Sequence, residues 1–391
     1  MTSLDAFAQK KLLSLEGQGL RRHILDSHRT AEGKVIRAKD ESQEMANRPL
    51  ISFCCNDYLN FTHHPKVKQA AKEAIDRYGT GAGASRLITG NHPLISQLEQ
   101  RLATFKGSED ACVFGTGYMA NIGIIPALIG QQDIIFIDEL SHACLRAGSD
   151  MSGAQIEFFH HNDMIHLEQL IHRHRAAHQN ALILTDGVFS MDGDLAPLDK
   201  LSDLAQAHDC WLMSDDAHGL GVIGGGKGSR HMFSPLPDIP LQMGTLSKAI
   251  GSFGGYLCAS KAVIALIKTR ARSLIYTTAL PPANAAAALA ALDIIAIDPG
   301  YCQRPMDNAR LFARLLNLPD VQSPIVPIII GSTAQTMKYA AALEEDGFLA
   351  VGIRPPTVAE RTARLRFTFS AGHHPGDIHA LAAAIRKHGI L

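Results

Sequence analysis

Short apolar segments alternate with longer amphipathic segments between residues 111 and 259, and this alternation restricts the chain to few folds. The short segments suit buried β-strands, and the amphipathic ones have the spacing of α-helices. Strands that alternate with helices in this way build a mainly parallel sheet covered by helices, an α/β architecture. We expect seven strands in this sheet, at 111–114, 133–137, 155–159, 181–185, 211–214, 241–243 and 256–259.

The rest of the chain predicts two further parts around this large domain. Residues 1–50 are strongly polar, with mixed helical periodicity over 4–30, and predict an N-terminal arm. The large domain is expected over 51–290 and a smaller α+β C-terminal domain over 291–391, joined by an alanine-rich helix at 281–297. Further helices are expected near 66–78, 92–105, 117–129, 163–178 and 198–208, and further strands at 51–53, 325–330, 349–353 and 365–369.

Composition favours a soluble, cytoplasmic protein with small-molecule partners. The formal net charge of the 391 residues is −1, so no basic surface indicates nucleic acid or an anionic membrane. No apolar run reaches the roughly 18–20 residues that span a bilayer, and the first thirty residues lack the apolar core of a secretory signal. The 7 cysteines are scattered without a CxxC pair, as expected of reduced intracellular thiols.

Three patterns resemble ligand sites but lack the context that such sites need. Residues 79–84 (GTGAGA) match a dinucleotide fingerprint, yet they follow an expected helix instead of a strand. Residues 221–227 nearly spell a phosphate-binding loop, but Gly228 occupies the place of the required serine or threonine. His174 and His178 lie four apart on an expected helix, in a cationic stretch without a completing carboxylate or cysteine. We therefore expect neither NAD nor a metal.

The strongest chemical signal is the stretch 211–219 (WLMSDDAHG), in which an apolar strand ends in Asp215 and His218 follows three residues later. The carboxyl edge of an open α/β sheet is where ligands bind. A carboxylate beside a pyridine nitrogen favours the protonated ring, because an opposite charge at close range stabilises the cation. A protonated ring of this kind serves as an electron sink.

Lys248 and Thr245 follow the next expected strand, in the stretch 245–248 (TLSK). A lysine there can form a Schiff base with an aldehyde cofactor, and Thr245 can bind a phosphate. Taken alone, either motif would more often be an exposed lysine or a helix-capping aspartate. Together, on consecutive strand ends, they indicate a site for an aldehyde cofactor with a pyridine ring.

Two further segments fit the same site. Residues 115–118 (GTGY) precede an expected helix, so the backbone N–H groups of Gly117 and Tyr118 could hold a phosphate, although an ordinary helix start looks the same. His142 follows the strand at 133–137, where an imidazole could stack on an aromatic ring. A single loop histidine is usually structural, so His142 is interpreted only through its neighbours.

Five segments of the chain resemble the α-oxoamine synthase family of fold-type I pyridoxal-phosphate enzymes. The likeness covers essentially the whole chain, and Asn60 and Arg86 depart from the usual family pattern. It implies pyridoxal 5′-phosphate as cofactor, a homodimer, and an acyltransferase that condenses an amino acid with an acyl thioester and releases CO2. The five segments are 56–59 (NDYL), 140–143 (LSHA), 187–193 (GVFSMDG), 215–219 (DDAHG) and 245–248 (TLSK).

Three more segments narrow the resemblance to particular members of that family. Residues 19–22 (GLRR), 353–358 (IRPPTV) and 362–366 (TARLR) are similar to members that join L-alanine to a pimeloyl thioester, carried by CoA or by an acyl carrier protein. Two alternatives stay open: a glycine-using synthase with another acyl-CoA, and a non-catalytic subunit that scaffolds a partner. The intact Lys248, Asp215 and His218 argue against the second.

The resemblance also implies a role for each candidate residue. Lys248 forms the Schiff base, Asp215 pairs with the pyridine nitrogen, and His142 stacks on the ring and touches the substrate. The other cofactor contacts would be His218 and Ser190 at the ring hydroxyl, Gly117, Tyr118 and Thr245, and Thr277 and Thr278 from across a dimer interface. The substrate contacts would be Arg21, Asn56, Thr357 and Arg366, the last as a bidentate partner for a carboxylate.

Overall fold

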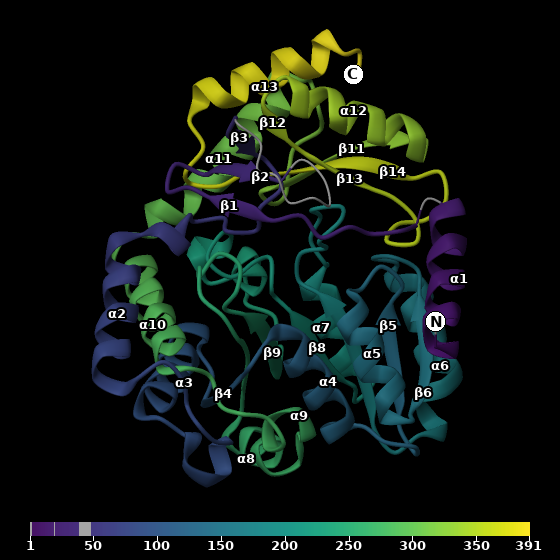
Figure 1. The fold of residues 1–391 in the computed structure, drawn as a ribbon. Coiled ribbons are helices and arrows are strands. Elements are labelled where there is room, and N and C mark those ends of the chain that lie inside the picture. The colour runs from purple at the N-terminus through teal and green to yellow at the C-terminus, as the bar shows by residue number, and fades with distance from the viewer. Residues whose placement is uncertain (1, 19, 39–47) are drawn as a thin grey trace.

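The computed structural model describes residues 2–18, 20–38 and 48–391, and a seven-stranded sheet lies at its centre (Figure 1). Strand β10 is antiparallel to both of its neighbours, β4 and β9, and the other paired strands run parallel. The predicted fold class and all seven strands are confirmed. In spatial order the strands are β4 (Asp110–Phe114), β10 (Gly255–Ala259), β9 (Leu241–Thr245), β8 (Trp211–Asp215), β7 (Ala181–Asp186), β5 (Ile134–Asp138) and β6 (Gln155–Phe159).

Helices cover both faces of this sheet, which explains why its strands are apolar at successive positions. In β5, Ile135 and Ile137 join a core cluster with residues of α4 (Gly117–Leu128) and α8 (Lys261–Arg270). Ile134 and Phe136 point to the opposite face and pack with α6 and α7. The other helices of this region are α2 (Pro65–Tyr78), α3 (Pro93–Lys106), α5 (Ala143–Ser152), α6 (Met164–His174), α7 (Leu198–Ala207), α9 (Arg272–Ile275) and α10 (Pro282–Ile297).

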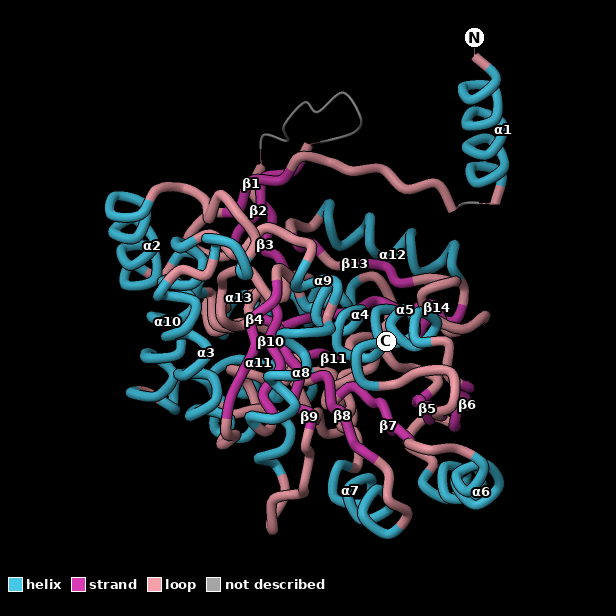
Figure 2. Tube along the Cα trace, turned by 90° about the horizontal axis from the view of Figure 1, so that it is seen from below, coloured by secondary structure: helices cyan, strands magenta, loops and turns pink. Residues whose placement is uncertain are grey.

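The N-terminal residues add a helix and two strands that were not expected as separate elements. No residue of α1 (Ser3–Gly17) is buried, and the helix stands away from the body of the molecule (Figure 2). Strands β1 (Ser27–Arg29) and β2 (Lys34–Arg37) pair antiparallel and extend to β3 (Leu50–Ser52). Strand β3 in turn pairs parallel with β12 (Phe348–Leu349), so this sheet joins residues from both ends of the chain. The division at residues 50 and 290 stays a prediction.

The C-terminal region contains a second, three-stranded sheet, of β11 (Ile325–Gly331), β14 (Ala363–Thr368) and β13 (Val351–Ile353). The prediction of one strand over 349–353 is wrong. Phe348 pairs with Ile51 in the sheet of β1, β2, β3 and β12, whereas Val351 pairs with Arg366 of β14. The chain therefore passes from one sheet to the other between residues 349 and 351. The helices here are α11 (Pro299–Leu315), α12 (Thr333–Glu345) and α13 (Pro375–Lys387).

Two local details refine the sequence-based expectations. The helix expected over 163–178 ends earlier, because α6 stops at His174 and a short 3-10 turn covers Arg175–Ala177, so His178 is not on the same α-helix. Asn60 has a φ of 54° and a ψ of 32°, in the left-handed region. Glycine and asparagine adopt this region most readily, so asparagine suits the backbone at this departure from the family pattern.

Among the described residues, no single helix is long and apolar enough to cross a bilayer. The pair formed by α10 and α11, bent by 86°, meets the length and composition criteria only when both helices are taken together.

Candidate active site

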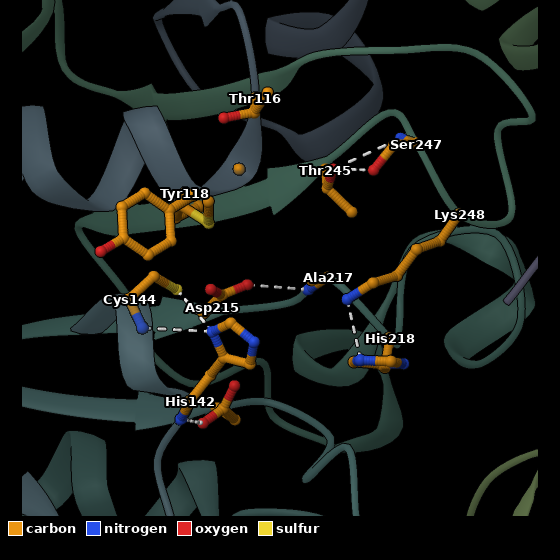
Figure 3. A pocket seen from close by; sticks show the side chains of 13 residues that line it. Thr116, Tyr118, His142, Cys144, Asp215, Ala217, His218, Thr245, Ser247 and Lys248 are labelled. Carbon is orange, nitrogen blue, oxygen red and sulfur yellow. Dashed lines mark hydrogen bonds between the residues drawn. The ribbon is translucent and has the colours of Figure 1, made fainter. Parts of the chain in front are cut away.

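A cavity of about 210 Å³ opens at the carboxyl ends of β7, β8 and β9 (Figure 3). In parallel sheets these ends gather the residues that follow each strand, so side chains distant in sequence meet there. Most of the predicted cofactor residues lie together in this one cavity. Its lining consists of Thr116, Gly117, Tyr118, His142, Cys144, Asp186, Asp215, Ala217, His218, Met243, Thr245, Ser247 and Lys248.

The amine of Lys248 reaches into the cavity from the loop after β9. Its Nζ lies 2.8 Å from Nε2 of His218. Burial lowers the pKa of Lys248, and the opposite charges of Asp215 and Asp186 only partly oppose this effect. The pKa of His218 is held well below its usual value by burial first and by the positive charge of Lys248 second. A lysine in this environment is more readily neutral, and therefore nucleophilic and basic, than one on the surface.

The carboxylate of Asp215 is fixed at the end of β8 by two hydrogen bonds. The side-chain amide of Asn121, on α4, donates to Oδ2 at 2.8 Å, and the backbone N–H of Ala217 donates to Oδ1 at 3.0 Å. Asp215 is buried, and Asn121 is fully buried. A buried carboxylate held in one orientation is suited to pair with a cationic ring nitrogen.

His142 caps the start of α5 and faces the cavity. Its backbone N–H donates to Oδ2 of Asp186 at 2.8 Å, and its Nδ1 lies 2.8 Å from Sγ of Cys144. Burial lowers the pKa of His142, and burial together with the nearby Asp215 raises the pKa of Asp186 well above its usual value. A neutral imidazole with a fixed orientation is suited to stack on an aromatic ring.

The opposite end of the cavity is built for an anion. Thr116 caps α4 through its hydroxyl, and the N–H groups of the first helical turn have no partners within the helix. A Cβ atom at Gly117 would lie 3.4 Å from both Met243 and Thr245, so the backbone of the first helical turn runs directly beside Thr245. The hydroxyls of Thr245 and Ser247 lie 2.8 Å apart beside it.

The groups around this cavity match the functional groups of pyridoxal phosphate one by one. Lys248 supplies an amine for the aldehyde, Asp215 a carboxylate for the pyridine nitrogen, and His142 a ring to stack. The first turn of α4, with Thr245 and Ser247, supplies donors for the phosphate. This set of donors and acceptors fits the cofactor.

Arg366, Asn56 and Ser190 form a cluster beside the cavity. Nε of Arg366 donates to the carbonyl oxygen of Ser190, and its Nη2 lies 3.4 Å from Oδ1 of Asn56. Arg366 is only 7% exposed, and its charge contributes to lowering the pKa of His218. The cluster is therefore electrostatically coupled to the cavity.

Arg21 and Thr357 lie in a second, larger cavity of about 870 Å³ between the N-terminal arm and residues 352–357. Leu12, Leu15 and Leu20 give it an apolar wall, and Arg21, Arg22 and Arg354 give it positive charge. Nη1 of Arg21 lies 3.1 Å from a carboxylate oxygen of Glu16. Gly19 of the predicted GLRR segment lies outside the described residues.

Thr277 and Thr278 lie in a third, small cavity that also includes Arg86 and Gly115. Thr278 forms an isolated β-bridge with Ser85. Nη1 of Arg86 lies 2.6 Å from the carboxylate of Glu99 and also donates to the carbonyl oxygen of Val113 at 3.2 Å. Arg86, the second departure from the family pattern, therefore forms a structural ion pair with Glu99 in this chain.

Several residues of the main site were not identified from the sequence, among them Asp186, Asn121 and Cys144. Asp186 ends β7 just as Asp215 ends β8, so the same rule of strand-end carboxylates would have found it. Asn121 lies inside α4 without a distinguishing motif, and only tertiary packing brings it to Asp215. Cys144 follows His142 by two residues at the start of α5, and its Sγ also contacts the amide of Asn121.

Neither His174 nor His178 belongs to a group with metal-ligand spacing in the described part of the chain. The one group that comes close enough consists of Glu168, His172 and His208, on the surface of α6 and after α7. Glu168 and His172 are exposed, and the group lies apart from the main cavity. The expected absence of a metal stays a prediction.

Comparison with known proteins agrees with the geometry. Residues 48–385 match the family model for aminotransferase class I and II. The chain is 59% identical to an 8-amino-7-oxononanoate synthase of Beijerinckia indica subsp. indica, over 98% of each chain. A serine palmitoyltransferase of S. paucimobilis, solved with a bound PLP–myriocin aldimine, matches all of both chains at 27% identity with a TM-score of 0.90. A crystal structure of 8-amino-7-oxononanoate synthase from Francisella tularensis matches 87% of this chain and 98% of its own at 28% identity, with a TM-score of 0.74.

Proposed function

This chain belongs to the 8-amino-7-oxononanoate synthase family of pyridoxal-phosphate-dependent acyltransferases, and from that membership we propose that it condenses L-alanine with a pimeloyl thioester. The products are 8-amino-7-oxononanoate, CO2 and the free thiol of the acyl carrier, in a step of biotin synthesis. The observation that carries the proposal is the Lys248 cavity, whose groups fit the cofactor, and a separate apolar, arginine-rich cavity between the arm and residues 352–357 supports it.

The residues of the first cavity divide the amino-acid chemistry between them. The cofactor, when bound, acts as an electron sink for the electron pair left at Cα of alanine. Lys248 accepts the Cα proton, because burial favours its neutral form. Asp215, held by Asn121 and Ala217, keeps a negative charge at the ring nitrogen. His142, which lines the same cavity, would stack on the ring.

The two carboxylates of the substrates would be bound by arginines. Arg366, next to Asn56 and Ser190, is suited to the carboxylate of alanine through its planar, bidentate guanidinium. The second cavity suits the pimeloyl chain, since leucines line its wall and Arg21, Arg22 and Arg354 can meet a carboxylate at the far end. Thr357 lies in the same lining.

The acyl preference tests this assignment. We expect pimeloyl-CoA to give at least about 10-fold higher kcat/KM than heptanoyl-CoA, equivalent to about 1.4 kcal/mol, because a site built around a charged group rejects a ligand that leaves it unpaired. Arg21→Ala should shrink this ratio. Steady-state kinetics with both donors measures it, and Arg310→Ala, an exposed arginine on α11 that pairs with Asp307, serves as the matched control.

Other outcomes of that assay point to a sister activity. Equal rates with heptanoyl-CoA, or a preference for glycine with acetyl- or succinyl-CoA, would assign the chain to a glycine-using synthase such as 2-amino-3-ketobutyrate CoA ligase or 5-aminolevulinate synthase. A colourless purified protein without turnover would favour a non-catalytic family subunit. The intact lysine, aspartate and histidine of the cavity support the catalytic alternative.

We also propose a cytoplasmic homodimer. Thr277 and Thr278 lie in a separate cavity of their own chain, as suits residues that reach the phosphate of a second copy. The seven cysteines are free thiols, which supports a reducing compartment. An acyl carrier protein could replace CoA as thioester donor, since the proposed contacts involve only the acyl chain.

A further inference from the structure

Tyr58, in the NDYL segment after β3, is fully buried outside the cavity lining, and it contacts His218 of that lining. Its hydroxyl oxygen lies 2.7 Å from Nδ1 of His218. The two rings meet edge to face, with centroids 6.0 Å apart and planes at 67°. The same hydroxyl also lies 3.5 Å from Oδ1 of Asn56, so the contact with His218 is the shorter of the two. A short hydrogen bond from a fully buried tyrosine marks a specific interaction.

The other ring nitrogen of His218 faces the reacting amine. Nε2 lies 2.8 Å from Nζ of Lys248 (Figure 3). The imidazole therefore bridges Lys248 and Tyr58. Burial and the positive charges of Lys248 and Arg366 keep this histidine neutral by lowering its pKa. In a neutral imidazole one nitrogen donates and the other accepts. A hydroxyl can do either, so Tyr58 satisfies Nδ1 in both tautomers.

The backbone on both sides holds Tyr58 in place. The backbone N–H of Tyr58 donates to the carbonyl of Asn56 at 2.9 Å, and its carbonyl accepts from the N–H of Ala371 at 2.7 Å. The neighbouring carboxylate of Asp57 accepts from the backbone N–H of Phe61 at 2.9 Å and from the hydroxyl of Thr62 at 2.5 Å. Burial raises the pKa of Tyr58 to about 12, so the phenol stays protonated at neutral pH.

We propose that Tyr58 is a positioning residue, whose hydroxyl fixes the imidazole of His218 so that Nε2 is presented to Lys248. Without the hydroxyl, Nδ1 of His218 would be buried without a partner, and the ring would turn or admit water to satisfy it. Either change weakens the contact with the amine. The inference rests on the proposed function only in taking Lys248 as the reacting lysine.

Tyr58→Phe tests this role because it removes only the hydroxyl. We expect kcat to fall about tenfold, which corresponds to about 1.4 kcal/mol, with little change in KM for the amino acid. The pH midpoint of the visible absorption change of the cofactor-loaded enzyme should also shift, a readout that requires no substrate. Tyr256→Phe, which removes the hydroxyl of another fully buried tyrosine outside the cavity lining, should leave both kcat and the midpoint unchanged.

A double-mutant cycle with His218→Ala separates positioning from packing. If Tyr58 acts through His218, adding Tyr58→Phe to His218→Ala should cause almost no further loss in kcat. Additive losses, or a Tyr58→Phe enzyme with unchanged kcat and midpoint, would overturn the proposal. The absorption readout keeps this test independent of which amino acid and thioester the enzyme uses.

The wild-type enzyme offers a second measurement if Tyr58→Phe folds poorly. With 15N-labelled histidine, the His218 ring, assigned by its absence from His218→Ala, should show one protonated and one hydrogen-bonded nitrogen in a single tautomer. Chemical shifts of a freely exchanging, water-exposed imidazole would contradict the proposal.

Discussion

Lys248→Ala is expected to abolish both the visible absorption of the bound cofactor and turnover, with kcat falling about a thousandfold or more. Lys248 is the lysine of the cavity lining, its amine lies 2.8 Å from His218, and burial lowers its pKa. No other described lining residue carries an amine that could replace it. Absorbance spectra of the purified variant and steady-state rates check the result.

Labelling identifies the lysine directly. Borohydride reduction of the wild-type enzyme should attach the cofactor to the peptide that contains Lys248, as detected by mass spectrometry. Lys261→Ala is a suitable control, because Lys261 begins α8 on the surface, and it should keep the spectrum and activity. A tag on Lys261, or on Lys268 beside Glu99, would assign the site to another lysine.

The central sheet could be predicted because its strands are apolar on both faces and the helices between them are amphipathic. Strand β5 shows this, since Ile134 and Ile135 belong to different core clusters on opposite faces. Such segments form strands in any context that provides two covering layers. The pattern is local, so single-sequence reasoning detects it.

The missed elements depend on distant partners. Strands β1 and β2 are short, and β2 is held in the sheet by pairing with β3. Strand β3 in turn pairs with β12, which lies almost 300 residues further along the chain. Helix α5 is rich in small residues, and Gly148 lets it approach α4: a side chain there would lie 2.7 Å from the carbonyl oxygen of Asn121. Neither requirement is visible in a local pattern.

The residues of the site also fall into those that a local pattern predicts and those that only tertiary packing brings together. Asp215 and Lys248 could be predicted because each follows a recognisable strand, and strand ends meet at one edge. Asn121 and Tyr58 could not be assigned a role, because the first contacts Asp215 from a buried helix and the second contacts His218 across 160 residues of sequence. Their contribution depends on tertiary packing.

Asp215→Asn is expected to keep bound cofactor and lose most turnover, with kcat falling well over tenfold. The neutral amide no longer stabilises positive charge at the ring nitrogen, and losing a charge partner next to developing charge costs several kcal/mol at the transition state. The amide also fits the site less well. Asn121 and Ala217 both donate to the carboxylate, so one of them would face the NH2 group of the new side chain.

The neighbouring Asp216 provides the control that separates charge at the ring from loss of a buried carboxylate. Asp216 pairs with the buried amine of Lys106 at 2.9 Å and accepts from the backbone N–H of Ser229, so it faces the 221–229 loop instead of the cavity. Asp216→Asn should lower Tm, because Lys106 loses its charged partner, yet keep kcat near that of the wild type at a temperature where the variant is folded.

Asp215→Asn should show the reverse: a full visible band and little turnover. A kcat above about a tenth of wild type in Asp215→Asn, a deficit of only about 1.4 kcal/mol, would mean that another group keeps the ring protonated. The buried Asp186, beside Asp215 on the next strand, would then be the first residue to test.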